Sequence, residues 1–140
     1  LDILSNPDEF GKWMKHFSTS TIIKQISPTD YYHYTVADAP WPISDRDNIA
    51  HIRIEKKANN EVIMHISSVP DFLPEKEGLV RVPESTGYWK LIPISENSTK
   101  VVHQALARPG GAIPDWLANL GVVKIPFDTL QNLHNWFANK

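Results

Sequence analysis

The sequence of 140 residues contains no cysteine, which excludes a disulfide framework, a thiolate nucleophile and a cysteine-ligated zinc site. It has no run of about 18 uncharged apolar residues, so no segment is predicted to span a bilayer. Charges of the two signs nearly balance, with 14 Lys+Arg against 16 Asp+Glu and a formal net charge of -2, which gives no electrostatic footprint for nucleic acid. No Gly-rich phosphate loop, Gly-x-Ser-x-Gly elbow or His-Glu-x-x-His helix is found, which lowers the expectation of an enzyme.

The residues that are present have the composition of a folded, water-soluble chain. Apolar residues make up 41% and charged residues 21%, and the length suits one hydrophobic core. Residues 1–140 are therefore predicted to form a single domain. Because the chain begins at Leu1 rather than Met, we expect its start to be a processed or truncated end.

The first twenty residues predict a short amphipathic helix between Ser5 and Phe17. Ser-Asn-Pro-Asp-Glu is a helix-start pattern, with a capping residue, an early proline and acids in the first turn. From Ser20 onward, β-branched and aromatic residues alternate with turn residues, which predicts strands. The predicted strands cover residues 21–27, 31–38, 47–56, 61–69, 87–94 and 99–107, and the short turns between several of them favour an antiparallel meander.

The last thirty residues predict an amphipathic helix of about seven turns. Apolar side chains recur near helical spacing from Ile113 to Phe137, and Pro114 suits the first turn. Pro126 lies inside this pattern and is expected to bend or split the helix near residues 122–123. In the strand over residues 47–56, alternation places Ala50, Ile52 and Ile54 on one face, so the helix is expected to cover that face.

Side chains able to carry chemistry are scattered. The six histidines occur singly, with none paired at metal-ligand spacing, so no metal or other cofactor is predicted. Asp45-Arg46-Asp47 admits two interpretations. One is a carboxylate pair flanking an arginine; the favoured one is structural, with Arg46 tying a turn to its neighbours.

Three segments together resemble the START (StAR-related lipid transfer) domain of the helix-grip superfamily. APWPISDRD at residues 39–47 is similar to that family's entry into a central strand. PEKEGLVR at residues 74–81, followed by GYWKLIP at residues 87–93, is similar to its loop and Trp-containing strand. RPGGAIPDWLAN at residues 108–119 is similar to the start of its closing helix, with Arg108 where the family often has Asp. The motif style favours a bacterial origin.

This resemblance implies an α+β helix-grip fold, a curved antiparallel sheet around a long C-terminal helix, with a tunnel for one lipid or similar apolar molecule. The family's N-terminal helix and about three strands have no counterpart here, so residues 1–140 are expected to be a partial START-like domain. An incomplete sheet would expose an edge near the first strands, which leaves self-association open, alongside transient membrane contact. Some sterol-carrying members place an acid and an arginine at positions that correspond to Val36 and Ile52.

The predicted function is binding or transport of a hydrophobic small molecule without catalysis. Physically, an apolar volume between sheet and helix gains free energy when hydrocarbon fills it. The hinge-like residues are predicted to be Gly110, Gly111 and Pro126. Alternation and helical spacing give the predicted ligand-binding residues: Tyr32, Tyr34, Val36, Ala50, Ile52, Ile54, Ile63, His65, Trp89, Leu91, Leu117, Leu120, Phe127 and Leu130.

Two alternatives remain open. A polyketide cyclase or aromatase of the same superfamily would use His65 or Tyr34 as acid or base, and it would need polar groups that converge with Arg46 in the cavity. A closed structural domain would contain no cavity, and its core would not accept a larger residue at Ile52.

Overall fold

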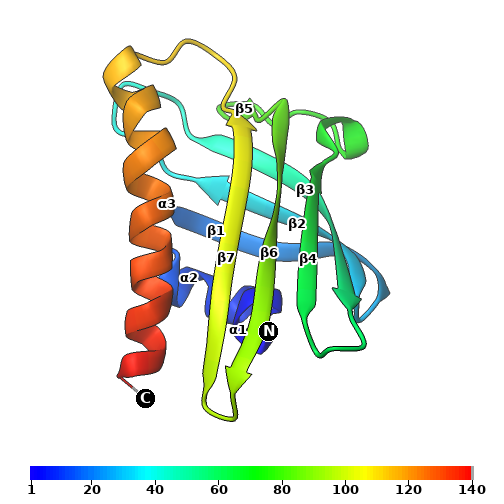
Figure 1. Ribbon diagram of the computed structural model, residues 1–140. Helices are drawn as coiled ribbons and strands as arrows, with labels where there is room; N and C mark the ends of the chain where they lie inside the picture. Colours follow the sequence, from blue (N-terminus) through cyan, green and yellow to red (C-terminus); the bar gives the residue numbers. More distant parts are fainter. Residues whose placement is uncertain (140) are drawn as a thin grey trace.

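The computed structural model describes residues 1–139, except for the side chains of residues 120–122 (Figure 1). Two short helices open the chain, a meander of strands follows, and a long helix closes it. The elements are α1 (Asp2–Ser5), α2 (Pro7–Trp13), β1 (Phe17–Ser27), β2 (Asp30–Ala37), β3 (Arg46–Lys56), β4 (Val62–Ser68), the 3-10 turn η1 (Pro70–Phe72), β5 (Val80–Arg81), β6 (Glu84–Ser95), β7 (Ser98–Arg108) and α3 (Asp115–Ala138).

The described strands form one seven-stranded sheet in the order β1-β2-β3-β4-β6-β7. Neighbours along this path pair antiparallel, while the short β5 pairs with β3 in parallel. The sheet curves, and α3 runs along its left side in this view (Figure 1). All six predicted strands are confirmed, as is the α+β helix-grip architecture. The sheet ends at β1 and at β7, so an unpaired edge lies at β7 as well as near the first strands.

The N-terminal helix is shorter than predicted and divided in two. The Asn6 side chain accepts a hydrogen bond from the Asp8 backbone N–H at 3.0 Å and caps α2, with Pro7 in its first turn. The helix ends at Trp13, and Phe17 already pairs with Ala37 in the sheet. Strand pairing of the β-branched and aromatic residues overrides the helical spacing of Phe17.

The pairing register sorts the strand residues onto two faces, because directly opposite residues point the same way. The face that packs against the helices is called the inner face, and it carries Tyr31, Ala50, Ile52, Met64 and Trp89, all buried. The helices contribute Ile3, Leu4, Trp13 and Leu133 to the same core. The opposite, outer face has a second small cluster of Tyr34, Val36 and Ile49, covered by residues of the segment 69–79.

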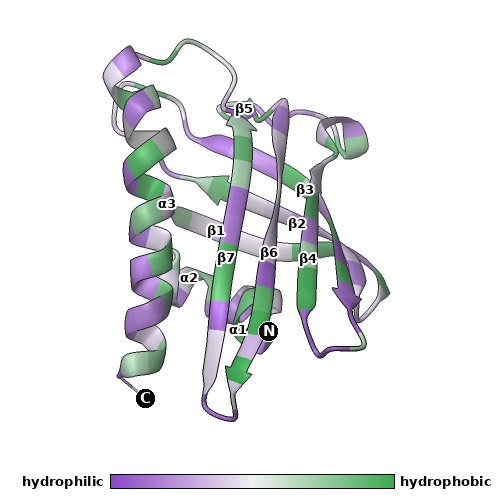
Figure 2. Cartoon of the chain, viewed as in Figure 1, coloured by the Kyte–Doolittle hydropathy of each residue, from purple (hydrophilic) through white to green (hydrophobic). Residues whose placement is uncertain are grey.

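Helix α3 is continuous from Asp115 to Ala138 despite Pro126, so the predicted split does not occur. Proline removes a single backbone hydrogen bond, and the turns on either side keep theirs. Hydrophobic residues recur along α3 and along β4, β6 and β7 (Figure 2). The helix is held mainly near its C-terminal end, where Leu133 enters the core beside Trp13 of α2.

Candidate functional site

The inner face of the sheet is an apolar surface beneath the helices. Five predicted ligand-binding residues lie on it: Ala50, Ile52, Ile54, Trp89 and Leu91. Only some of this surface is tightly packed. Ala50, Ile52 and Trp89 are 4 to 5% exposed, whereas Ile54 and Leu91 are only half-buried.

The predicted face of β2 is wrong by one residue. Tyr32, Tyr34 and Val36 pair with His51, Ile49 and Asp47, and therefore lie on the outer face. The inner positions belong to Tyr31, His33 and Thr35 instead. A one-residue slip in register moves every side chain of a strand to the other face. Because Val36 points outward, it does not occupy an inner-face position like the one the family resemblance implied.

The same correction applies to β4, where Ile63 and His65 lie on the outer face. His65 Nε2 lies 3.2 Å from the Glu55 carboxylate at the surface, away from the helices. Met64 and Ile66 take the inner positions. Alternation cannot decide this strand because both of its faces mix apolar and polar residues and are partly buried.

The predicted residues of α3 divide into three groups. Leu117 is half-buried, and the side chain of Leu120 lies outside the described part of the structure. Phe127 is 65% exposed and does not pack in the core, whereas Leu130 is 36% exposed and lies three residues before Leu133, so its contact with a ligand stays a prediction. The buried side chains of this helix are Thr129 and Leu133, four residues apart on one side. Phe127, two residues before Thr129, therefore points to the other side.

A polar pair on the inner face was not predicted. Ser20 Oγ and His33 Nε2 are 2.8 Å apart across β1 and β2, and both residues are half-buried. The Phe10 ring of α2 lies edge-on to the imidazole, with ring centroids 5.3 Å apart. Burial lowers the pKa of His33 to about 4, so the ring is neutral at physiological pH. This pair is found only once the face that His33 occupies on β2 is known, and the sequence pattern does not determine that face.

Three buried polar atoms have no hydrogen-bond partner within residues 1–139: Trp13 Nε1, Arg46 Nε and Asn48 Oδ1. Asn48 pairs with Thr35 and so shares the inner face with His33. Trp13 belongs to the core on that side of the sheet. Buried polar groups are normally paired, so this concentration of unpaired atoms is a feature of the inner side of the sheet.

An ion pair on the outer face holds the segment that leads to β5. The Arg81 guanidinium donates to both Asp47 carboxylate oxygens at 2.8 and 2.9 Å, and to three carbonyl oxygens of residues 70–74. Tyr34 donates to Asp47 at 2.9 Å. Burial alone would raise the pKa of Asp47, but the hydrogen bonds from Arg81 and Tyr34 outweigh it and lower the pKa. Burial and the hydrogen bond to Asp47 raise the pKa of Tyr34 to about 12.

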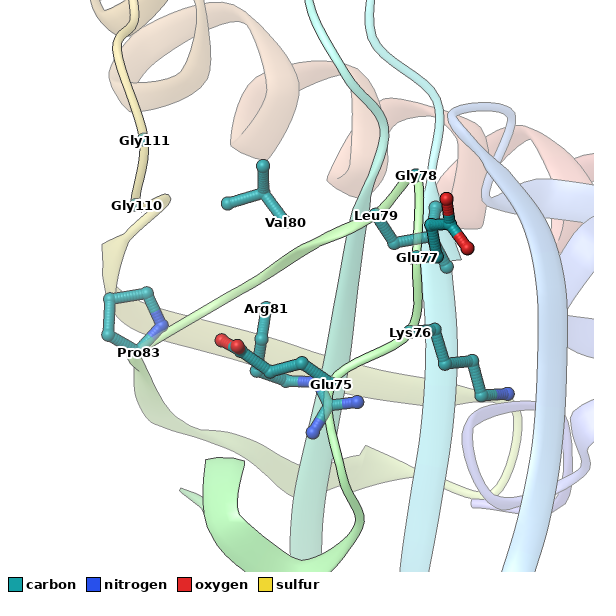
Figure 3. A pocket seen from close by; sticks show the side chains of 10 residues that line it. All are labelled: Glu75, Lys76, Glu77, Gly78, Leu79, Val80, Arg81, Pro83, Gly110 and Gly111. Carbon is teal, nitrogen blue, oxygen red and sulfur yellow. The ribbon is translucent and has the colours of Figure 1, made fainter.

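Arg46 performs the structural role that the sequence favoured. Its guanidinium donates to the carbonyl oxygens of Ser44 and Gly110, the latter at 2.8 Å, and so joins β3 to the loop before α3. Gly110 and Gly111 have φ angles of 72° and 65°, which favour glycine. A pocket of about 670 Å³ lies between these glycines and residues 75–83 (Figure 3). Gly110 and Gly111 remain predicted hinge residues.

The structure does not assemble the site that a cyclase would need. Tyr34 bonds to Asp47 and His65 lies near Glu55, both on the outer face, while Arg46 bonds to backbone carbonyls. Within residues 1–139, no group of three or more acidic or histidine side chains could hold a metal ion. None of the described helices is both long and apolar enough to cross a membrane.

An antiparallel sheet curved against one long C-terminal helix, with an apolar inner face, defines the helix-grip class of α+β proteins. The model of the START domain matches residues 2–135 of this chain. Because that match covers nearly the whole chain, the protein belongs to the START-domain family.

Relatives of known structure or name support the same assignment. A STAR-related lipid transfer protein from Xanthomonas axonopodis is 38% identical, with a TM-score of 0.86 over 98% of this chain and 76% of that one. An uncharacterised protein of Pseudomonas aeruginosa is 40% identical over 89% of this chain. The phosphatidylcholine transfer protein of Mus musculus is 24% identical over 84% of this chain. The chain spans 61% and 56% of the lengths of these last two proteins.

Proposed function

We propose that this START domain binds a lipid or similar hydrophobic molecule between the inner face of its sheet and α3, and carries it without chemical change. One observation carries the proposal: the inner face is apolar and lies beneath a helix, yet much of it is only half-buried. Binding gains about 25 cal/mol of free energy for each Å² of this apolar surface that a ligand removes from water. The half-buried inner residues are Ile22, Ile54, Ile66, Leu91 and Val101.

The long helix supports the proposal because it does not close over the sheet along its whole length. Its described buried side chains, Thr129 and Leu133, lie in the C-terminal half. Trp116 and Val123 in the N-terminal half are 57% and 70% exposed. A helix held at one end can move at the other, which would admit a ligand to the inner face.

Two of the similar proteins are a STAR-related lipid transfer protein and a phosphatidylcholine transfer protein, and this is a second line of support. Catalysis has no comparable support, because the residues proposed for acid or base chemistry lie apart on the outer face. Of the predicted ligand-binding residues, we retain Ala50, Ile52, Ile54, Trp89 and Leu91.

Organic extraction of the purified protein, followed by mass spectrometry, tests the proposal directly. We expect a hydrophobic molecule to co-purify in about stoichiometric amount. The variant Ile66→Trp fills the inner face and should lose most of this ligand. Ile63→Trp adds the same bulk on the outer face of the same strand and is the matched control. Wild-type protein that extracts empty, and that takes up no lipid from vesicles, would refute the proposal.

A further inference from the structure

We propose that the ligand is uncharged where it lies against the sheet, and that an oxygen atom of a hydroxyl or carbonyl group binds at the Ser20–His33 pair. This inference rests on the proposed function and adds the chemical class of the ligand. It arises from three features of the inner face: an accessible polar pair, an unpartnered amide oxygen nearby, and an absence of charge around both.

The Ser20–His33 pair is positioned to receive a ligand atom. Ser20 Oγ occupies one nitrogen of the ring, Nε2, at 2.8 Å. The other nitrogen, Nδ1, has no partner in the described part of the chain, and both residues remain half-buried rather than sealed. Phe10 packs edge-on to the ring and fixes its orientation. Directly opposite His33 on β3 is Ala50, whose side chain is small.

A neutral imidazole offers one donor and one acceptor, and so matches an uncharged oxygen. If Nε2 accepts from the Ser20 hydroxyl, Nδ1–H donates to a ligand carbonyl or hydroxyl oxygen; in the other tautomer, Nδ1 accepts from a ligand hydroxyl. Asn48 lies diagonally across from His33, and residues at such positions are about 7–8 Å apart, with their Cβ atoms somewhat closer. Its buried Oδ1 lacks a donor, which a ligand hydroxyl can supply.

Charge is confined to the ends of the inner face. By register, the inner positions of β3 run from Arg46 at one end to Lys56 at the other, and the four positions between them are uncharged. Arg46 is 8% exposed and donates from its terminal nitrogens to two backbone carbonyls, and its unpartnered Nε lies two inner positions along β3 from Ala50, the residue opposite His33. The inner positions of β2, β4, β6 and β7 carry no Asp, Glu, Lys or Arg, and burial lowers the pKa of the two histidines among them, His33 and His103.

A phosphate group beside the Ser20–His33 pair, between the charged ends of this face, would lose its water without gaining a cation. Burying an unpaired charge is far more costly than burying a hydroxyl that finds hydrogen-bond partners. The protein should therefore bind two lipids with identical acyl chains with different affinities when their headgroups differ in charge. A diacylglycerol presents one free hydroxyl and two ester carbonyls, whereas a phospholipid presents a phosphodiester.

Competitive uptake from vesicles tests this inference. Delipidated protein is incubated with vesicles that contain equal amounts of dioleoylglycerol, dioleoylphosphatidylcholine and dioleoylphosphatidylglycerol, and the retained lipid is quantified by mass spectrometry. We expect dioleoylglycerol to be retained about tenfold or more over either phospholipid, as one unmatched polar group would produce. Preferential retention of either phospholipid would overturn the inference while leaving the proposed function intact. Retention of no lipid would overturn both.

Substitutions of Ser20 and His33 test whether the polar oxygen of the ligand binds at this pair. His33→Ala should reduce dioleoylglycerol retention by about tenfold, the effect of one lost hydrogen bond in a dry site. Ser20→Ala removes the same pair with little change in volume and should act in the same direction if His33→Ala folds poorly. His65→Ala, on the outer face, is the matched control and should retain lipid as wild type does. Unchanged retention by folded His33→Ala and Ser20→Ala would contradict this assignment.

Discussion

Arg81 and Asp47 form a buried ion pair on the outer face, with side chains 2% and 0% exposed. Arg81→Met would leave the Asp47 carboxylate buried without its cation. We expect the free energy of unfolding to fall by roughly 3–5 kcal/mol, as for other buried pairs broken on one side. Urea unfolding monitored by tryptophan fluorescence measures the loss.

The matched control is the exposed pair of Arg108 and Glu84, whose side chains are 77% and 35% exposed. Glu84→Gln should change the free energy of unfolding by less than about 1 kcal/mol. Equal losses in Arg81→Met and Glu84→Gln would show that burial does not decide the energetics of these pairs.

His33 predicts that the protein loses stability in mild acid. Burial lowers its pKa to about 4 in the folded state, against about 6.5 in the unfolded chain, so the unfolded chain binds the extra proton between these values. The free energy of unfolding should therefore fall by about 3 kcal/mol as the pH drops from 7 to 4, in addition to the effect of other groups.

Urea unfolding of wild type and His33→Gln at several pH values isolates this contribution. Glutamine cannot titrate and can still bond to Ser20, so the variant should show a shallower dependence on pH. His103, whose pKa burial also lowers against an opposing backbone hydrogen bond, is present in both proteins and cancels in the comparison. Parallel pH profiles would be inconsistent with a neutral, buried His33.

The face that a residue occupies is predictable from the sequence only where the two faces of its strand differ clearly in polarity. Alternation predicts the inner face of β3 correctly because the charged residues Arg53 and Glu55 alternate with apolar residues such as Ile52 and Ile54. In β2, Tyr31 and Tyr34 are both 4% exposed, although they lie on opposite faces. The outer cluster around Ile49 supplies a second apolar environment that alternation cannot anticipate. The Ser20–His33 pair depends on this register and was missed for the same reason.

At the scale of elements, α3 has one buried side and one exposed apolar side, and two substitutions separate them. Leu133 is 4% exposed in the main core, so Leu133→Ala should cost about 2–5 kcal/mol through lost burial and a cavity. Phe127 is 65% exposed, so Phe127→Ala should change stability by no more than about 0.5 kcal/mol. Thermal and urea unfolding measure both, and a larger loss in Phe127→Ala would contradict the described orientation of α3.

The positions of the strands and helices are easier to predict from the sequence than the face on which each side chain lies. The strands are regular runs of β-branched and aromatic residues between turn residues, and each was found from local pattern alone. The N-terminal helix was predicted too long because Phe17 fits helical spacing, whereas long-range pairing with Ala37 places it in β1. Pro126 predicted a split that the rest of α3 prevents. Both errors arise where tertiary contacts or cooperativity outweigh a local preference.

At the scale of the whole molecule, two unsatisfied surfaces predict self-association of this chain at high concentration. One consists of the unpaired edges of the sheet, at β1 and at the eleven-residue strand β7. The other is the exposed apolar side of α3, where Val123, Phe127 and Phe137 are 70%, 65% and 58% exposed. Free strand edges and apolar patches both favour association in water.

Sedimentation velocity over a wide concentration range tests this expectation. Phe127→Glu should shift the distribution toward the monomer, and Asn135→Glu, an exposed polar position on the same helix, should leave it unchanged. A wild-type chain that stays monomeric throughout would show that these surfaces are tolerated in water.

The attachment of α3 at its C-terminal half has a consequence for amide hydrogen exchange. The N-terminal half of α3 has fewer buried contacts than the C-terminal half, so its backbone hydrogen bonds should open more often. Deuterium should therefore label the amides of the helix as a gradient. Amides near Leu133 should be the slowest to label, and those just after Asp115 the fastest. A bound ligand beneath the N-terminal half should flatten this gradient, and exchange would then report occupancy without any label on the ligand.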